Sequence, residues 1–186
     1  MRIISGEAKG RALFAPSGQD TRPTSDKIRG SLFNIIGARV LDARVLDLFG
    51  GTGALALEAL SRGAESAVIA DNSHAAWQAI DRNARSVLKG DFEFRVQILR
   101  SDYRSAIGAL EGRIFDLVFL DPPYRMTDLR EVTAALRPLL APDSLVVIEH
   151  KAGEMPAVGD GFEAADQRRY GAAGILMLTP REVETA

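Results

Sequence analysis

Between Ala43 and Glu149 the sequence alternates short apolar runs with amphipathic stretches, and this alternation limits the possible folds more than any other feature. Each run is rich in Val, Ile, Leu or Phe and is short enough to be a buried strand. The runs are Arg44–Phe49, Ser66–Ala70, Phe94–Leu99, Phe115–Leu120 and Ser144–Glu149. The stretches between them predict helices at Ala54–Arg62, Ser73–Leu88, Arg104–Leu110 and Thr127–Leu140. This order of strands and helices predicts an α/β fold, with a parallel sheet covered by helices on both faces.

The segment after Glu149 breaks the alternation. Lys151–Gly161 contains three glycines and one proline, which is typical of a loop. Phe162–Tyr170 and Gly174–Thr179 then predict two strands, and the glycine-containing connection between them favours an antiparallel hairpin. We expect this hairpin to form one edge of the sheet.

The segment before the first predicted strand forms a smaller unit. Met1–Ser5 and Ala12–Ala15 are spaced to pair as a hairpin, and Asp26–Gly37 predicts a helix with its apolar side chains on one face. These features divide the chain into an N-terminal extension, residues 1–40, and a main domain, residues 41–186.

The charge of the chain is unevenly distributed. Residues 1–30 carry six basic and three acidic side chains, a charge of +3, whereas the whole chain has a formal net charge of −2. A basic segment on an acidic body favours contact with nucleic acid. Short N-terminal segments are also often basic by chance, so charge alone leaves both interpretations open.

A glycine turn lies between a predicted strand and a predicted helix, in the sequence Val-Leu-Asp-Leu-Phe-Gly-Gly-Thr-Gly-Ala at residues 45–54. Glycines allow the backbone to approach a ligand where a Cβ would clash, and the free amides at the helix start favour an electron-rich group. In a doubly wound sheet, ligands bind at the carboxyl ends of the strands beside the switch point. Asp71 ends the next strand, where an acid accepts both hydroxyls of a ribose. The sequence therefore predicts a site for an adenosine-containing cofactor.

The spacing of the turn narrows the choice of cofactor. Gly51-Thr-Gly53-Ala-Leu-Ala56 lacks the third glycine common in NAD sites, and no Gly-Lys-Ser/Thr follows, which excludes a Walker-type phosphate site. Asp47 precedes the turn, where a carboxylate repels a pyrophosphate but suits a cationic amino acid group or a sulfonium. The run from Asp47 to Gly53 resembles motif I of the class I S-adenosylmethionine methyltransferases. A strand–turn–helix unit without a ligand is the alternative.

The tetrapeptide Asp121-Pro122-Pro123-Tyr124 ends the strand predicted at Phe115–Leu120. Two prolines halt the sheet and remove competing amide donors, which leaves the Asp121 carboxylate and the Pro122 carbonyl as acceptors beside Tyr124. Such a group positions a planar exocyclic amine for attack once the base has left its stack. The tetrapeptide resembles motif IV of the amino-methyltransferases, which act on adenine, cytosine or guanine amines and on some glutamine amides. A turn after a strand is the alternative.

Nearly the whole chain resembles the RsmD family, bacterial methyltransferases that modify the N2 amine of one guanine in 16S ribosomal RNA. The most specific parts of the resemblance are Arg22–Thr24, Arg29 with Phe33 and Asn34, and Asp121–Tyr124. It implies a Rossmann-like, seven-stranded sheet with one antiparallel edge strand and a small N-terminal hairpin. It also implies S-adenosyl-L-methionine as cofactor, S-adenosyl-L-homocysteine as product, and 16S rRNA within the 30S subunit or its assembly particle as substrate. Gly30 stands where the family usually has Glu, which leaves any role of that acid in doubt.

The motifs and the resemblance together name the candidate site residues. The resemblance implies that Asp71 binds the ribose and that Asp102 lies by the adenine. The expected cofactor site consists of Asp47, Phe49, Gly50, Gly51, Gly53, Asp71, Asn72, Asp102 and Tyr103. The expected catalytic residues are Asp121, Pro122 and Tyr124. The expected contacts to RNA phosphate are Arg22, Lys27 and Arg29, with Arg2, Lys9 and Arg11 behind them, although solvated surface charges are the alternative.

Three further side chains receive simpler interpretations. His74 is expected at the surface near Asp71, and His150 receives no role. Trp77 is expected to pack in the core of its helix, with a position beside the adenosine as the alternative.

Composition excludes several classes of protein. The chain has no cysteine, so it has no disulfide and no thiolate metal site, and its two histidines cannot by themselves form a three-ligand zinc centre. We therefore expect no metal. No run approaches the roughly 20 apolar residues that cross a bilayer, and no signal peptide is visible. We expect a cytoplasmic monomer without membrane contact.

Three other functions compete with rRNA methylation. A DNA adenine-N6 or cytosine-N4 methyltransferase is disfavoured because 186 residues leave no evident target-recognition domain. A nicotinamide-dependent oxidoreductase is disfavoured by the missing third glycine. A non-catalytic RNA-binding protein would have little use for a cofactor turn combined with a proline-flanked acceptor pair.

Overall fold

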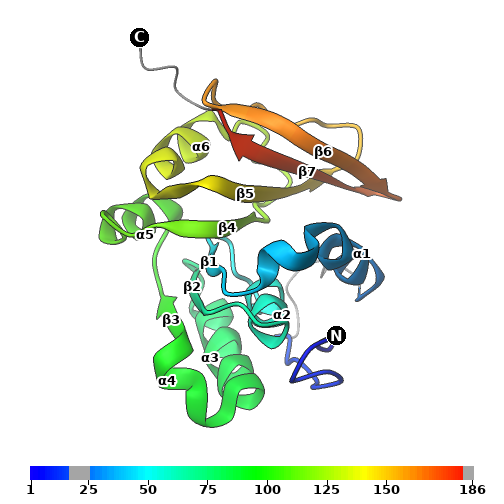
Figure 1. Cartoon of the computed structure of the whole chain (residues 1–186), viewed down its shortest axis with the longest axis vertical. Helices are drawn as coiled ribbons and strands as arrows, with labels where there is room; N and C mark the ends of the chain where they lie inside the picture. Colours follow the sequence, from blue (N-terminus) through cyan, green and yellow to red (C-terminus); the bar gives the residue numbers. More distant parts are fainter. Residues whose placement is uncertain (17–25, 182–186) are drawn as a thin grey trace.

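A computed structural model of the chain describes residues 1–16 and 26–181 (Figure 1). Within this part of the chain, seven strands form one sheet in the order β3-β2-β1-β4-β5-β7-β6. The strands are β1 Arg44–Asp47, β2 Ser66–Ala70, β3 Val96–Leu99, β4 Phe115–Leu120, β5 Leu140–Lys151, β6 Phe162–Tyr170 and β7 Ala173–Pro180. Pairs from β3 to β5 are parallel, whereas β7 runs antiparallel to both β5 and β6. The α/β class and the C-terminal hairpin are thus confirmed, and β7, the reversed strand, lies one place inside the edge.

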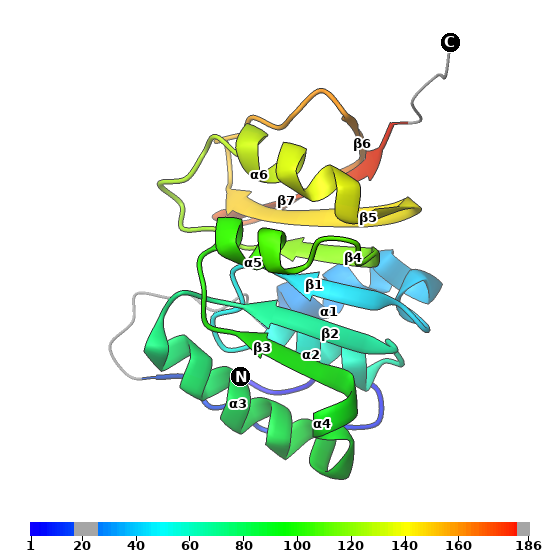
Figure 2. The ribbon, with the colours of Figure 1, turned by 90° about the vertical axis from the view of Figure 1, so that its left-hand side faces the viewer.

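Helices cover both faces of this sheet, and Figure 2 shows β5, β4, β1, β2 and β3 one below the other between them. The α-helices are α1 Asp26–Ile36, α2 Ala54–Ser61, α3 His74–Leu88, α4 Phe92–Arg95, α5 Tyr103–Ala109 and α6 Arg130–Leu136. Short 3-10 helices follow three of them, at Gly37–Val40, Lys89–Asp91 and Arg137–Leu139. The side chains of α1, α2 and α3 share one apolar cluster with the sheet, and those of α5 and α6 share another. Because these strands are covered by helices on both faces, their sequences are continuously apolar.

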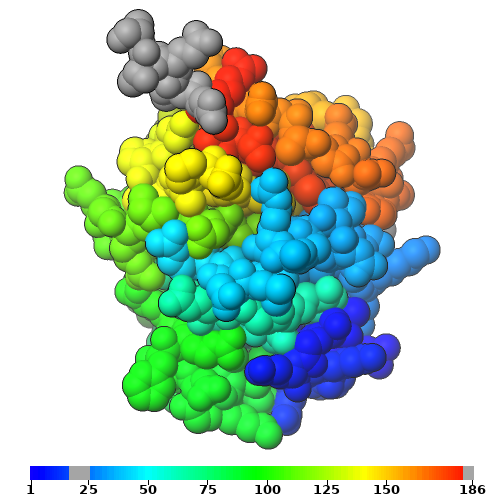
Figure 3. All heavy atoms as spheres, in the orientation of Figure 1, coloured from blue at the N-terminus to red at the C-terminus, as the bar shows by residue number. Residues whose placement is uncertain are grey.

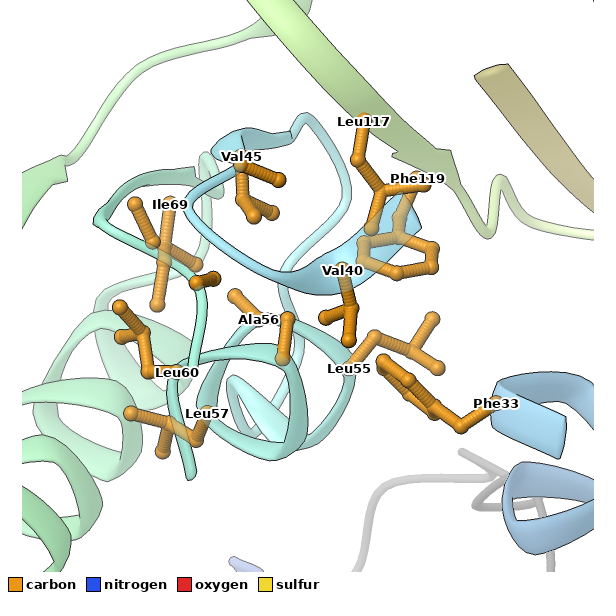
Figure 4. Close-up of a cluster of buried hydrophobic side chains, with 14 of the residues drawn as sticks. Phe33, Val40, Val45, Leu55, Ala56, Leu57, Leu60, Ile69, Leu117 and Phe119 are labelled. Atoms are coloured by element: carbon orange, nitrogen blue, oxygen red, sulfur yellow. The ribbon is translucent and has the colours of Figure 1, made fainter. Parts of the chain in front are cut away.

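The larger cluster joins α1 to the centre of the sheet. Phe33 of α1 points toward Leu55 of α2 and Phe119 of β4 (Figure 4), and the Phe33 and Phe119 ring centroids lie 5.8 Å apart. All three side chains are at most 8% exposed. The N-terminal helix therefore shares the core of the main domain, and the division of the chain after residue 40 stays a prediction.

Several predicted boundaries are wrong, among them those of the strand predicted at Ser144–Glu149, which extends over Leu140–Lys151 as β5. The strand predicted at Phe94–Leu99 begins only at Val96, because Phe92–Arg95 form a helical turn that buries Phe92 and leaves Phe94 87% exposed. The helix predicted at Thr127–Leu140 is α-helical only over α6, because Asp128 pairs with Ala157 in a β-bridge and holds the preceding residues extended.

The predicted N-terminal hairpin is present in a short form: Arg2 and Ala12 form a β-bridge, and backbone hydrogen bonds join Ile3 to Arg11 and Leu13 to Met1. The backbone N–H groups of Ile4 and Ser5 instead donate to the Glu58 carboxylate of α2, at 2.7 and 3.0 Å, so they are not available to a strand partner. We call residues 1–16 the N-terminal arm. Figure 3 shows its dark-blue atoms lying against the body of the molecule. Backbone groups, rather than side chains, therefore attach much of the arm to α2.

Candidate active site

A cleft of about 1180 Å³ opens at the carboxyl ends of β1 and β4, which are neighbours in the sheet. The chain leaves β1 toward β2 on one side, while β4 lies on the other, so this is the switch point of the sheet. Asp47 pairs with Phe119 in the register of the two strands, which places Asp121 two residues beyond that pair. Gly50, Gly51 and Asp121–Tyr124 line the cleft, as the sequence predicts, whereas Gly53 is not part of its lining and stands at the start of α2.

The glycine turn is folded tightly against β2. A Cβ on Gly50 would lie 2.4 Å from the Ile69 side chain, so only glycine fits there. Gly51 has a φ of +55°, a left-handed conformation that also favours glycine. The Asp71 carboxylate accepts a hydrogen bond from the Gly51 N–H at 2.9 Å and another from the Ser73 N–H at 2.8 Å. Asp71 therefore shapes the turn in addition to lining the cleft.

Asp47 is 1% exposed at the end of β1. Burial raises the pKa of its carboxyl to about 7, and the charge of Asp71 adds to the rise. Its Oδ1 has no hydrogen-bond partner among the described residues, although it belongs to a residue that lines the cleft. A buried acceptor without a partner is costly unless a ligand supplies one, and a cationic ligand compensates best.

The segment Asp121–Tyr124, which we call the acceptor segment, follows β4 and lines the same cleft. Burial, followed by the charges of Glu149 and Asp47, raises the pKa of the Asp121 carboxyl well above its usual range. Pro122 is buried, whereas Tyr124 is 39% exposed and presents its ring at the surface of the cleft. Five carboxyl groups thus line one cleft, which suits a positively charged ligand: those of Asp47, Asp71, Asp102, Asp121 and Glu149.

The other end of the cleft carries the residues predicted beside the adenine. Asp102 lines it and caps α5, and the Ser105 backbone N–H bonded to its carboxylate holds the pKa of Asp102 below its usual range. Phe49 and Tyr103 form part of the wall, with ring centroids 6.0 Å apart, and the exposed Asn72 lies near Asp71. Apolar rings with a few polar groups between them are typical of sites for flat ligands.

Arg29, predicted to contact RNA, is fully buried, and this prediction is wrong. It lies on the inner face of α1, where its guanidinium donates to the Arg2 carbonyl and pairs with Asp26 at 3.0 Å. Its Nε lies 3.7 Å from the buried Glu58 carboxylate. The helix turns this side chain toward a buried acid, so it stabilises the arm instead of reaching solvent.

The remaining predicted RNA contacts have different surroundings. Lys9, Arg11 and Lys27 are exposed, and within residues 1–16 and 26–181 none of them has an ion-pair partner. Arg2 is exposed but lies 3.6 Å from Asp26. Arg22 lies outside the described residues.

Comparison with known proteins identifies the family. The model of the family described as conserved hypothetical protein 95 matches residues 1–179. The chain belongs to this family, the RsmD family. It is 36% identical over 186 residues to the Bacillus subtilis protein named “Putative rRNA methyltransferase YlbH”, covering 97% of this chain and all of that one. It is also 36% identical over 151 residues to ribosomal RNA small subunit methyltransferase D of Escherichia coli, covering 80% of this chain and 74% of that one.

A solved structure agrees with this membership. The Escherichia coli protein described as “Putative methyltransferase yhhF” superposes with a TM-score of 0.82, at 31% identity, over 97% of each chain. The fold of the RsmD-family chain is therefore that of the class I methyltransferases.

Sequence reasoning missed several residues of the cleft, two of which carry polar groups into it. Glu149 lies near the carboxyl end of β5, and Ser101, whose buried Oγ has no hydrogen-bond partner in the described structure, precedes Asp102. Glu149 stands at the end of a predicted apolar run, and Ser101 flanks the predicted residue Asp102. The order of the strands in the sheet would have placed both at the cleft. Among the described residues, no three His, Cys, Asp or Glu side chains are placed to hold a metal ion.

Proposed function

We propose that this protein methylates the exocyclic N2 amine of a guanine in small-subunit ribosomal RNA. One observation carries the proposal: residues 50–52 of the glycine turn and the Asp121–Tyr124 segment line the same cleft. Transfer of a methyl group to nitrogen depends mainly on holding donor and acceptor in line, so a single cleft that serves both is what the reaction needs.

The choice of RNA rests on the relatives and on the arm. The Bacillus subtilis and Escherichia coli relatives are both named for ribosomal RNA, and the second is named for its small subunit. Lys9, Arg11 and Lys27 are exposed cations of the kind that contact phosphate. Proteins with this fold act on many different substrates, so the fold itself does not indicate RNA. The support comes from the relatives and from the exposed cations.

The methyl donor is S-adenosyl-L-methionine, and S-adenosyl-L-homocysteine is its product. When bound, it supplies an electrophilic methyl group attached to a sulfonium. The residues of the cleft fit it: Asp47 offers an unsatisfied carboxylate oxygen to an ammonium group, and Ser101 an unsatisfied hydroxyl. Asp71 is placed to accept ribose hydroxyls through the second lone pairs of its oxygens.

The acceptor segment orients the amine. The Asp121 carboxylate and the Pro122 carbonyl accept hydrogen bonds from the two amine hydrogens, and the Tyr124 ring stacks on the base. Because neither proline has an N–H, no backbone donor at these positions competes for the acceptors. The carboxylate of Asp121 is partly shielded from solvent, which strengthens its hydrogen bond to the amine, and its raised pKa makes it a suitable acceptor for the proton released after transfer.

The wider setting is part of the same proposal. We place the substrate guanine in 16S rRNA of the 30S subunit or an assembly particle, and the protein in the cytoplasm as a monomer. The base must leave its stack to enter the cleft. No helix in the described ranges is long and apolar enough to cross a membrane.

Replacement of Asp121 tests the proposal. Asp121→Ala should lower labelled-methyl transfer to small-subunit particles by about 100-fold or more, because one positioned acceptor is lost, while binding of S-adenosyl-L-homocysteine remains. Asp128→Ala is the matched control, since Asp128 is an exposed acid nearby that does not line the cleft.

The same assay with different substrates distinguishes an rRNA methyltransferase from a DNA methyltransferase. Small-subunit particles, free 16S RNA and DNA are compared, and the modified base is identified by mapping. Methylated DNA without methylated RNA would support the competing DNA amino-methyltransferase. Near-normal turnover by Asp121→Ala would refute the catalytic assignment.

A further inference from the structure

The only tryptophan of the chain, Trp77, is not part of the core that sequence reasoning expected. It is half-buried on α3 and belongs to neither apolar cluster of the described structure. Its ring instead stacks on the ring of His74, with centroids 5.9 Å apart and planes inclined by 10°. The expectation of core packing is therefore wrong, and an aromatic pair is exposed at the start of α3.

Arg100 completes a small group with these two rings. Its Nη1 lies 3.2 Å from Nδ1 of His74. A guanidinium can only donate, so Nδ1 is the acceptor and the ring proton of His74 lies on Nε2. Arg100 is exposed and has no ion-pair partner among the described residues, whereas Arg104 nearby is paired with Glu131. We call this group, His74, Trp77 and Arg100, the Trp77 patch. Because no described acid pairs with Arg100, the positive charge of its guanidinium is not neutralised.

The Trp77 patch lies next to the cleft but outside it. Its members are chain neighbours of cleft residues, since His74 follows Ser73 and Arg100 precedes Ser101. The strands that these two segments follow, β2 and β3, are adjacent and parallel, so both segments leave the sheet at the same edge. His74, Trp77 and Arg100 themselves do not line the cleft. This position argues against a contact between Trp77 and a ligand inside the cleft.

The chemistry of the patch is that of a site for an unpaired nucleotide. Bases in single-stranded RNA stack on aromatic rings and on guanidinium planes, and a free guanidinium also binds phosphate. We propose that the Trp77 patch stacks on a base of single-stranded RNA next to the guanine that enters the cleft. This inference rests on the proposed function, because a base extruded into the cleft leaves its neighbours unstacked at the cleft edge.

Tryptophan fluorescence tests the inference directly, because Trp77 is the only source of that signal. Wild-type protein is titrated with a single-stranded RNA oligonucleotide that carries the target guanine, and separately with S-adenosyl-L-homocysteine. We expect RNA to quench the fluorescence and S-adenosyl-L-homocysteine to leave it unchanged. Binding of the RNA is followed independently by the anisotropy of a labelled oligonucleotide.

Variants measure the contribution of each side chain. Trp77→Ala should weaken RNA binding by about 5- to 100-fold, and should raise the KM for RNA with little change in kcat, while Trp77→Phe keeps most of the affinity. Arg100→Ala should weaken binding and reduce its salt dependence. Phe94→Ala is the matched control, because Phe94 is 87% exposed on α4 and away from the cleft. A native circular dichroism spectrum of Trp77→Phe confirms that the fold is retained.

The outcomes separate this inference from the proposed function. RNA that binds and is methylated without quenching, or with unchanged affinity in Trp77→Ala, overturns the inference and leaves the proposed function intact. Quenching by S-adenosyl-L-homocysteine alone assigns Trp77 to the cofactor site and also overturns it. A wild-type protein that neither binds nor methylates RNA refutes the proposed function, and the inference with it.

Discussion

Asp47 combines near-complete burial with a pKa raised from 3.8 to about 7. Between these two values the folded chain holds a proton that the unfolded chain has released, so stability falls as pH rises through this range. We expect Asp47→Asn to be more stable than the wild-type chain above pH 7, by up to about 4 kcal/mol, with the difference vanishing below about pH 4. Urea unfolding of both apoproteins across this pH range measures it, and a difference that does not change with pH would contradict it.

Among single residues, those that belong to a recognisable sequence motif could be predicted. Asp47 and Asp121 were found because each stands at the end of an apolar strand beside a glycine or proline turn, and Asp71 because it follows the next strand, since the carboxyl ends of adjacent parallel strands meet. Arg29 was misassigned because a charge is normally exposed, and only the tertiary contact with Glu58 makes its burial favourable. Glu149 was missed because its role depends on β5 lying beside β4.

At the scale of elements, Asn83 of α3 joins three parts of the chain. Its Oδ1 accepts from the Phe14 N–H at 2.7 Å, and its Nδ2 donates to the carbonyls of Phe14 and Thr52, both at 2.9 Å. Asn83 is 2% exposed, so its loss leaves buried backbone groups without partners. We expect Asn83→Ala to lower the free energy of unfolding by about 2–4 kcal/mol and to weaken binding of S-adenosyl-L-homocysteine, because Thr52 belongs to the glycine turn.

Calorimetric binding and urea unfolding of Asn83→Ala provide the measurement. Asn34→Ala is the matched control, since Asn34 is an exposed asparagine on α1. Unchanged cofactor affinity in a destabilised Asn83→Ala would show that the arm and the glycine turn are held independently.

Elements with strong local signals were predicted well, and those held by distant contacts were not. The helix predicted over Ser73–Leu88 forms as α3, and the Ser73 side chain caps its start by accepting from the Ala76 N–H. The C-terminal hairpin follows from its glycine connection. The N-terminal hairpin stays short because the Glu58 carboxylate, more than 50 residues away in the chain, takes the backbone N–H groups of Ile4 and Ser5.

For the whole molecule, the exposed cations of the arm and α1 determine how binding responds to salt. Lys9→Ala, Arg11→Ala and Lys27→Ala should each weaken RNA binding similarly for all sequences and lower the slope of log affinity against log salt by about 0.7–0.9 for each phosphate that is no longer neutralised. Binding titrations at several salt concentrations measure this slope. Arg168→Ala is the control, because Arg168 lies exposed on β6. An unchanged slope in all three variants would place the RNA elsewhere on the molecule.

The attachment of the arm through Glu58 bears on how these proteins diversify. The carboxylate holds the main-chain amides of Ile4 and Ser5, which every residue except proline supplies, so the side chains at these positions are free to vary without detaching the arm. Lineages can therefore vary these two positions at little risk to folding, whereas Ile3 is fully buried and a Cβ at Gly6 would collide with the Ser61 carbonyl. Evolutionary change at position 58 itself is restricted, since loss of that acid would leave the buried Arg29 without one of its anionic neighbours.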